Sequence, residues 1–156
     1  MKVEQKLKEM GIELPVPPKP AGAYMPCRKT GNLIYISGQG CRVDGELKYQ
    51  GKVGKDLDLE EGYDAAKICC INALSILKGE LDDLDKISKI INVHGYVNSA
   101  SGFTDQPSIV NGASELLIEI FGDKGRHSRC ALASCELPNN IPVELEMIVE
   151  VVDSCD

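Results

Sequence analysis

The residues best suited to chemistry lie near the end of the chain, in the stretch 126–146 (RHSRCALASCELPNNIPVELE). Arg129 stands in a small, apolar segment, and Glu144 and Glu146 share one face of a second strand-like run. Charged residues rarely occupy such surroundings unless they are paired or used. A guanidinium binds a carboxylate bidentately, and a glutamate can activate water beside it. The pattern therefore predicts a site for a small acid.

Each of these charged residues also has an ordinary structural interpretation. Arg129 could pair with Glu144 or Glu146, either across neighbouring strands or across a subunit boundary. The two glutamates alternate with apolar residues, as they would on the solvated face of a strand. Of the two histidines, His94 is expected to be a hydrogen-bonded strand residue. His127 is expected on a loop surface, although it could also touch a substrate.

The composition indicates one compact domain with a real core, because 43% of the 156 residues are hydrophobic. A net charge of -7 and 4% aromatic residues oppose nucleic-acid binding. No apolar run approaches the roughly 20 residues that span a bilayer. The N-terminus lacks the apolar region of a signal peptide. We expect a cytoplasmic protein without membrane or nucleic-acid partners.

The cysteine pattern specifies neither a disulfide framework nor a zinc site. The number is odd, no CxxC motif occurs, and only two histidines are present. Most cysteines are expected to be reduced core residues. No metal or organic cofactor is signalled. The seven cysteines are Cys27, Cys41, Cys69, Cys70, Cys130, Cys135 and Cys155.

The first third of the chain is expected to form a helix followed by hairpins. Residues 1–13 have the spacing of a short amphipathic helix, and the Pro-rich stretch 15–22 predicts an extended connector. A strand-like pattern starts at Ala23 and contains a hairpin turn at residues 29–32. The pair Asp44-Gly45 indicates a second hairpin.

Two longer helices are expected to support the strands. Asp58 and Glu61 have the spacing of a capping box, which opens a helix that runs to about Lys78. A buried strand follows at 87–98. A second helix is capped by Thr104 or Asp105, has a proline in its first turn, and ends at a glycine.

The resulting order is β-β-β-α-β-α-β-β, with the third strand short. This order predicts an α+β domain in which two helices pack on one side of a sheet. The strand that contains Arg129 is small or apolar on both faces. We therefore expect it to be covered on both sides, by helices and by a partner subunit.

Five local motifs, in this order and spacing, resemble the RidA/YjgF family, whose older label is endoribonuclease L-PSP. The resemblance extends from about Ala21 to Val152. The motifs are AGAY (21–24), YISGQ (35–39), VNGASELLIEIFG (110–122), SR followed by small residues (128–131), and ELPNNIPVELEMI (136–148).

The resemblance implies a chorismate-mutase-like fold with a mixed sheet, assembled as a homotrimer with active sites in three intersubunit clefts. It also implies hydrolysis of reactive enamines and imines, such as 2-aminoacrylate and its 2-imino acid tautomer, to 2-keto acids and ammonia. The expected division is an extension at 1–22, the family domain at 23–152, and a tail at 153–156.

The family motifs also imply the roles of individual residues. Arg129 would bind the substrate carboxylate, and Glu144 would position or activate water. The remaining pocket residues would be Tyr24, which is counted among the catalytic groups, Ser37, the backbone around Gly38, and Asn111.

Several features depart from the family pattern and indicate a divergent subgroup. Ala131 stands where many members have cysteine, His127 stands where proline or alanine is usual, and the N-terminal extension is long. An alternative function is therefore a non-catalytic protein that binds or senses a small carboxylate such as a 2-keto acid. A ribonuclease is disfavoured by the acidic charge and by the absence of a histidine pair.

Overall fold

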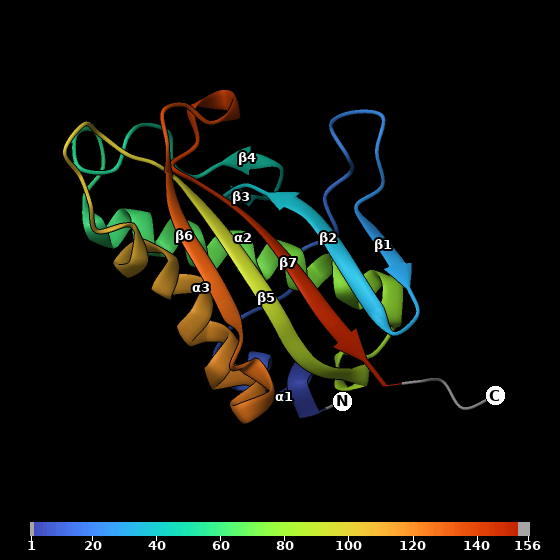
Figure 1. Ribbon diagram of the computed structural model, residues 1–156. Helices are drawn as coiled ribbons and strands as arrows, with labels where there is room; N and C mark the ends of the chain where they lie inside the picture. Colours follow the sequence, from blue (N-terminus) through green and yellow to red (C-terminus); the bar gives the residue numbers. More distant parts are fainter. Residues whose placement is uncertain (1, 153–156) are drawn as a thin grey trace.

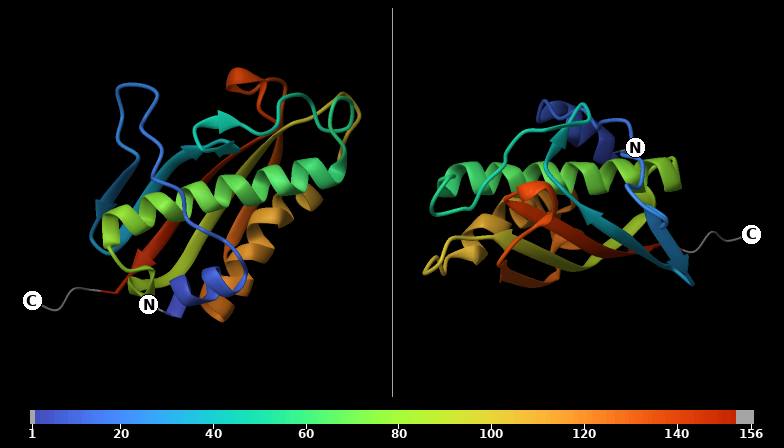
Figure 2. Two further views of the ribbon diagram at one scale, coloured as in Figure 1. Left: turned by 180° about the vertical axis from the view of Figure 1, so that it is seen from behind. Right: turned by 90° about the horizontal axis from the view of Figure 1, so that it is seen from above.

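The computed structural model describes residues 2–152, so the tail at 153–156, with Cys155, lies outside the described residues. A five-stranded sheet has two long helices on one face, while its other face is open (Figure 1, Figure 2). This arrangement confirms the expected α+β fold. None of the helices within residues 2–152 has the length and apolar character that a membrane crossing requires.

The chain contains three α-helices, seven strands and three short 3-10 turns within the described residues. The helices are α1 (Lys2–Glu9), α2 (Leu59–Leu81) and α3 (Gln106–Phe121). The strands are β1 (Cys27–Thr30), β2 (Leu33–Gln39), β3 (Arg42–Val43), β4 (Glu46–Leu47), β5 (Ile87–Asn98), β6 (Ser128–Ser134) and β7 (Val143–Val151). The 3-10 turns are Leu84–Lys86, Gly122–Gly125 and Pro138–Asn140.

The strand order is β1-β2-β7-β5-β6. Only the β5–β6 pair is parallel, which makes the sheet mixed as expected. The last strand in sequence, β7, lies at the centre, and β5 separates it from β6. The strands that contain Arg129 and Glu144 are therefore not neighbours, which removes the interpretation of a pair across adjacent strands of one chain.

Side-chain alternation along β7 assigns its residues to two faces of the sheet. Val143, Leu145 and Met147 are buried beneath the helices. Glu144 and Glu146 lie between them in the sequence and point to the open face. The apolar residues of β7 thus bury one face of the strand, and its glutamates remain available on the other.

The capping box at the start of α2 is confirmed. The Asp58 carboxylate accepts a hydrogen bond from the Glu61 N–H at 2.8 Å, and the Asp58 N–H donates to the Glu61 carboxylate at 2.9 Å. The helix continues past Lys78 because Leu81 is still buried in the core. It ends at Leu81, and the next residue, Asp82, has a left-handed φ of 61°.

Both predicted hairpins form. The first strand begins at Cys27 rather than near Ala23, because the prolines before it lack the N–H groups that a strand ladder needs. In the second hairpin, Asp44 and Gly45 have φ values of 52° and 85°, the left-handed pair that two-residue turns prefer. This hairpin forms a separate two-stranded sheet.

The cysteine prediction holds for four of the six described cysteines. All six are free, so no disulfide occurs within residues 2–152. The buried ones are Cys27, Cys41, Cys69 and Cys70, and the exposed ones are Cys130 and Cys135.

Helices α2 and α3 approach each other closely at Gly112. A Cβ atom at this position would lie 2.0 Å from the Tyr63 carbonyl oxygen, which belongs to helix backbone and cannot rotate away. We expect Gly112→Ala to lower the free energy of unfolding by about 1–3 kcal/mol, measured by urea denaturation. Gly79→Ala is the matched control, because its methyl group would lie 3.3 Å from the Pro17 ring. Equal stability of the two variants would contradict the prediction.

Candidate functional site

Glu144 lies in a pocket of about 270 Å³, at the end of the sheet where β2 ends and β7 begins. The lining includes Tyr24, Gly38 and Glu144, three of the residues expected in the site. Asn72 of α2 and residues 18–21 of the N-terminal connector complete its walls. The volume is near the lower end of the range typical of small-molecule sites.

Gly38 leaves space for the Glu144 side chain. The pairing of β2 with β7 shifts between Ile36 and Gln39, so the intervening residues form an irregularity in the strand. A Cβ atom at Gly38 would lie 2.2 Å from Glu144 Oε1. Residue 38 must therefore be a glycine if the Glu144 carboxylate is to keep this position.

Ser37 has structural bonds next to this pocket. Its N–H donates to the Pro26 carbonyl at 3.0 Å, and its hydroxyl donates to the Met25 carbonyl at 2.7 Å. These bonds fasten the segment before β1 to β2. Ser37 lines a neighbouring hollow of the open face together with His94 and Glu146, rather than the Glu144 pocket itself.

Glu144 and Glu146 of β7 have different surroundings. Glu146 accepts hydrogen bonds from Tyr96 at 3.0 Å and lies 2.9 Å from His94 Nδ1, so His94 is a hydrogen-bonded strand residue as expected. Among residues 2–152, no hydrogen bond or ion pair holds the Glu144 carboxylate. Burial, and then the nearby charge of Glu146, raise the pKa of Glu144. Glu144 is the free carboxylate of the pair.

Tyr24 and the Pro-rich connector form one side of the pocket. The Tyr24 hydroxyl accepts a hydrogen bond from the Ala21 N–H at 3.3 Å, which closes the turn between them. The tyrosine is 50% exposed, so its ring is accessible to a ligand. The connector, and not helix α1, reaches the pocket.

Arg129 lies on the helix-covered side of the sheet edge. Its register partner on β5 is the fully buried Val93, and its Nη1 donates to Asn111 Oδ1 at 2.7 Å and to Ser114 Oγ at 3.2 Å. Asn111 and Ser114 belong to α3. Within the described part of the chain, no bond joins Arg129 to Glu144. Arg129 and Asn111 are thus brought together, but away from the Glu144 pocket.

His127 is not a free loop-surface residue. Its ring is half-buried, with Nδ1 2.6 Å from the Gly125 carbonyl oxygen and Nε2 2.9 Å from Ser114 Oγ. Burial lowers the pKa of His127 most, and together with the charge of Arg129 it outweighs the opposing effect of the Gly125 carbonyl. Sequence reasoning missed Ser114. The signal was its position three residues after Asn111, on the same helix face.

The expected site residues therefore form two groups on opposite faces of one sheet. One group is the Glu144 pocket with Tyr24 and Gly38, and the other is Arg129 with Asn111. The Glu144 carboxylate can act on water, and the Arg129 guanidinium can bind an acid. Within a single chain, these two groups do not lie around one ligand.

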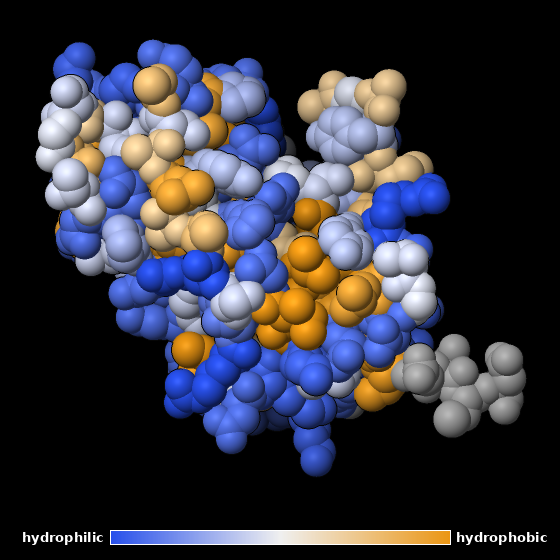
Figure 3. All heavy atoms as spheres, in the orientation of Figure 1, coloured by the Kyte–Doolittle hydropathy of each residue, from blue (hydrophilic) through white to orange (hydrophobic). Residues whose placement is uncertain are grey.

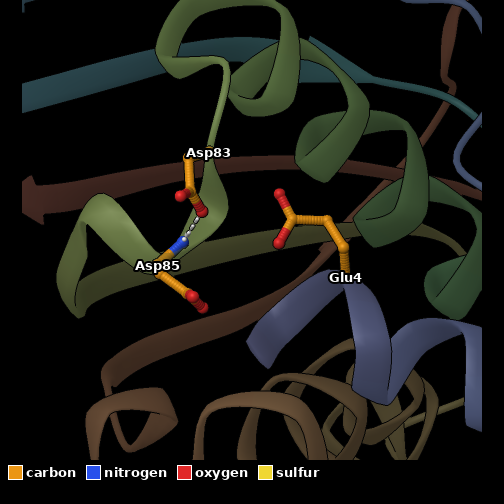
Figure 4. Close-up of side chains that lie close together, drawn as sticks. All are labelled: Glu4, Asp83 and Asp85. Carbon is orange, nitrogen blue, oxygen red and sulfur yellow. Dashed lines mark hydrogen bonds between the residues drawn. The ribbon is translucent and has the colours of Figure 1, made fainter. Parts of the chain in front are cut away.

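An acidic cluster elsewhere, formed by Glu4, Asp83 and Asp85, has a structural explanation (Figure 4). Glu4 accepts from Lys78 Nζ at 3.0 Å and from the Leu84 N–H at 3.1 Å. Asp83 accepts from the Asp85 N–H at 2.9 Å, and Asp85 accepts from backbone N–H groups at the start of α1. Glu4 and Asp85 fasten α1 to the turn before β5, and Asp83 caps the start of that turn.

Comparisons with known proteins assign this architecture to a family. A family model described as "YjgF/chorismate mutase-like, putative endoribonuclease" matches residues 4–151. "Protein TCP17" of Trypanosoma cruzi is 34% identical over 96% of this chain and 94% of its own length. A "2-iminobutanoate/2-iminopropanoate deaminase" of Dermatophagoides farinae is 26% identical over 90% of this chain and 94% of its own. A "putative endoribonuclease" structure from Shewanella oneidensis MR-1 superposes with a TM-score of 0.94, at 34% identity, over 97% of this chain and 100% of that one.

Proposed function

The chain belongs to the YjgF/chorismate mutase-like family, and we propose that it hydrolyses reactive enamines and imines, such as 2-aminoacrylate and 2-imino acids, to 2-keto acids and ammonia. The reaction would take place in clefts between the subunits of a homotrimer. The observation that carries the proposal is the Glu144 carboxylate, which has a raised pKa and no hydrogen-bond partner among residues 2–152, in a pocket that Arg129 of the same chain does not line. The deaminase named among the relatives supports the same chemistry.

The surface of a single chain supports association between copies. Strand β6 is an uncovered sheet edge, and Leu132 on it is 52% exposed. Apolar side chains also gather over the central strands of the open face, where Tyr35 is 46% exposed (Figure 3). Contiguous exposed apolar surface favours an interface. We propose that a second copy packed here contributes its Arg129 to the Glu144 pocket of the first.

Arg129 and Glu144 have different roles in the proposed reaction. Arg129 holds the substrate carboxylate, which orients the adjacent imine carbon. Glu144 removes a proton from water as the water oxygen attacks that carbon, and the imine nitrogen takes a proton from solvent, which gives a carbinolamine. Glu144 then returns its proton to the nitrogen, the C–N bond breaks to release ammonia, and the hydroxyl group loses its proton to solvent as the carbonyl forms. One water is consumed for each ammonia released.

Ribonuclease activity is disfavoured by the positions of the histidines. His94 pairs with Glu146 on the open face, whereas His127 bonds to Ser114 on the helix side. These positions do not form the histidine pair that could share acid and base roles at one phosphate. The net charge of -7 also repels an RNA backbone.

The experiment that tests the proposal generates 2-aminoacrylate in place with a serine dehydratase and traps its imine with semicarbazide. The protein is expected to speed pyruvate release and to suppress trapping. Arg126→Ala serves as the matched control for Arg129→Ala, since Arg126 is an exposed arginine paired with Asp123. Saturable binding of pyruvate without any turnover would instead support a small-carboxylate-binding protein.

The pH profile gives a separate prediction. Glu144 must be ionised to act as a base, and its pKa lies above the ordinary glutamate value because of burial and the charge of Glu146. We expect kcat/KM to rise with pH through this raised pKa. Glu146→Gln removes one of the two causes, so its half-maximal pH should be lower than that of the wild type. An unchanged or higher half-maximal pH would contradict the assignment of Glu144 as the base.

A further inference from the structure

A chain of hydrogen bonds holds the guanidinium of Arg129 at its Nη1 nitrogen. It runs from the Gly125 carbonyl to His127, from His127 to Ser114, and from Ser114 to Arg129, with distances of 2.6, 2.9 and 3.2 Å. Asn111 accepts a second bond from the same guanidinium at 2.7 Å. We refer to His127 and Ser114 together as the brace.

The direction of each bond follows from the chemistry of its partners. A carbonyl oxygen only accepts, so the hydrogen of the His127 ring must be on Nδ1. The neutral ring then accepts at Nε2, which requires the Ser114 hydroxyl to donate its one proton there. The guanidinium only donates, and the lone pairs of Ser114 Oγ are thereby left to accept from it. The lowered pKa of His127 is consistent with this neutral form.

The bonds also select which edge of the guanidinium remains available. Both described contacts, to Asn111 and to Ser114, are made by Nη1. Among residues 2–152, no hydrogen bond or ion pair involves Nε or Nη2 of Arg129. Nε and Nη2 are the two nitrogens that bind a carboxylate side-on with parallel hydrogen bonds. The guanidinium is held by one nitrogen, and its bidentate edge is left for a ligand.

Ser114 itself has little access to a ligand. Its side chain is 8% exposed, and its hydroxyl is engaged by both His127 and Arg129. The arrangement suits orientation of Arg129 rather than attack on a substrate.

We propose that His127 and Ser114 are positioning residues, which fix the Arg129 side chain so that its Nε and Nη2 edge faces the carboxylate of the substrate. This inference rests on the proposed function, because it assigns Arg129 as the group that binds the substrate carboxylate. It assigns a specific role to the histidine: its ring nitrogen accepts the hydrogen bond from Ser114.

The first measurement is independent of turnover. Nitrogen NMR of the whole protein is expected to show His127 as the neutral Nδ1–H tautomer and Arg129 as a slowly rotating guanidinium, with the arginine signals assigned by their loss in Arg129→Ala. In His127→Ala the guanidinium should rotate faster. His127→Gln should restore slow rotation, because its amide oxygen can accept from Ser114.

The second measurement is binding and kinetics. His127→Ala and Ser114→Ala are each expected to weaken pyruvate binding and to raise KM by about tenfold, with kcat changed less than about twofold, because orientation and not acid–base chemistry is lost. His127→Gln should recover most of the affinity. Methyl pyruvate, which lacks the charge, should bind all variants equally weakly. Ser108→Ala is the matched control, a partly exposed serine on the same helix whose hydroxyl bonds only to Asp105 among residues 2–152.

The outcomes separate this inference from the proposed function. Wild-type guanidinium rotation and wild-type KM in His127→Ala would overturn the brace while leaving the deaminase intact. A His127→Gln variant as impaired as His127→Ala would also overturn it. If the wild type does not accelerate imine hydrolysis but the arginine signals respond as expected, the brace stands and the proposed function fails.

Discussion

Replacing Arg129 with alanine is expected to lower kcat/KM for imine hydrolysis by about 10²–10⁴-fold. The substitution removes two charge-assisted hydrogen bonds to the substrate carboxylate, each worth roughly 1.5–3 kcal/mol. It should leave folding nearly intact, because Arg129 lies at a sheet edge and makes bonds only to Asn111 and Ser114 in the described structure. The imine-trapping assay measures the first effect, and urea denaturation measures the second.

Arg129→Lys separates the contribution of the positive charge from that of the planar guanidinium. A lysine keeps the positive charge but lacks the planar pair of donors, so we expect most of the loss to remain. Arg126→Ala removes the other arginine of the same hollow, whose guanidinium pairs with Asp123 and is not held by Asn111 or Ser114, and it should keep wild-type rates. Full activity in Arg129→Ala would refute the role of Arg129 in binding the substrate carboxylate, whether or not the substitution changes the assembly of subunits.

Replacing Glu144 with glutamine is expected to reduce kcat by about 10²–10⁴-fold with a smaller change in KM. The amide has nearly the same shape, so the contact with the Gly38 backbone is kept, while the ability to accept a proton from water is lost. The measurement is a comparison of kcat and KM with those of Glu150→Gln, which alters another glutamate on the same face of β7. A loss confined to KM would show that Glu144 binds the substrate but does not transfer protons.

Co-assembly of Arg129→Ala and Glu144→Gln subunits tests whether each site takes residues from two subunits. If each cleft takes Arg129 from one subunit and Glu144 from its neighbour, co-assembled Arg129→Ala and Glu144→Gln subunits contain some clefts with both wild-type residues. Random mixing in equal amounts should restore about a quarter of the wild-type activity. No recovery in verified mixed assemblies would place both residues in the same subunit's site and contradict the intersubunit cleft.

Local patterns predicted the elements well because their causes are local. The capping box at Asp58 and Glu61 depends on residues three positions apart, and the left-handed pair at Asp44 and Gly45 depends on two adjacent residues. The end of α2 was less predictable. Its last turn is held by burial of Leu81 against distant parts of the chain, which spacing within the helix does not reveal.

The site was predictable as a set of residue types and only partly as a geometry. Sequence motifs pointed to Arg129, Glu144, Tyr24 and Gly38, and the structure places the last three around one pocket. The brace was not foreseen, because the hydrogen bond between Ser114 and His127 joins a helix to the start of a strand. Such a contact depends on how α3 lies across the sheet.

The sequence by itself determined the order of the elements, the alternation that separates the glutamates of β7 from its buried residues, and the family resemblance. Only the tertiary structure decided that β5 lies between β6 and β7, and that the register of these strands places Arg129 and Glu144 on opposite sides of the sheet. The physical reason is that strand order follows from the packing of the whole core, whereas periodicity reports only which side of each strand is buried.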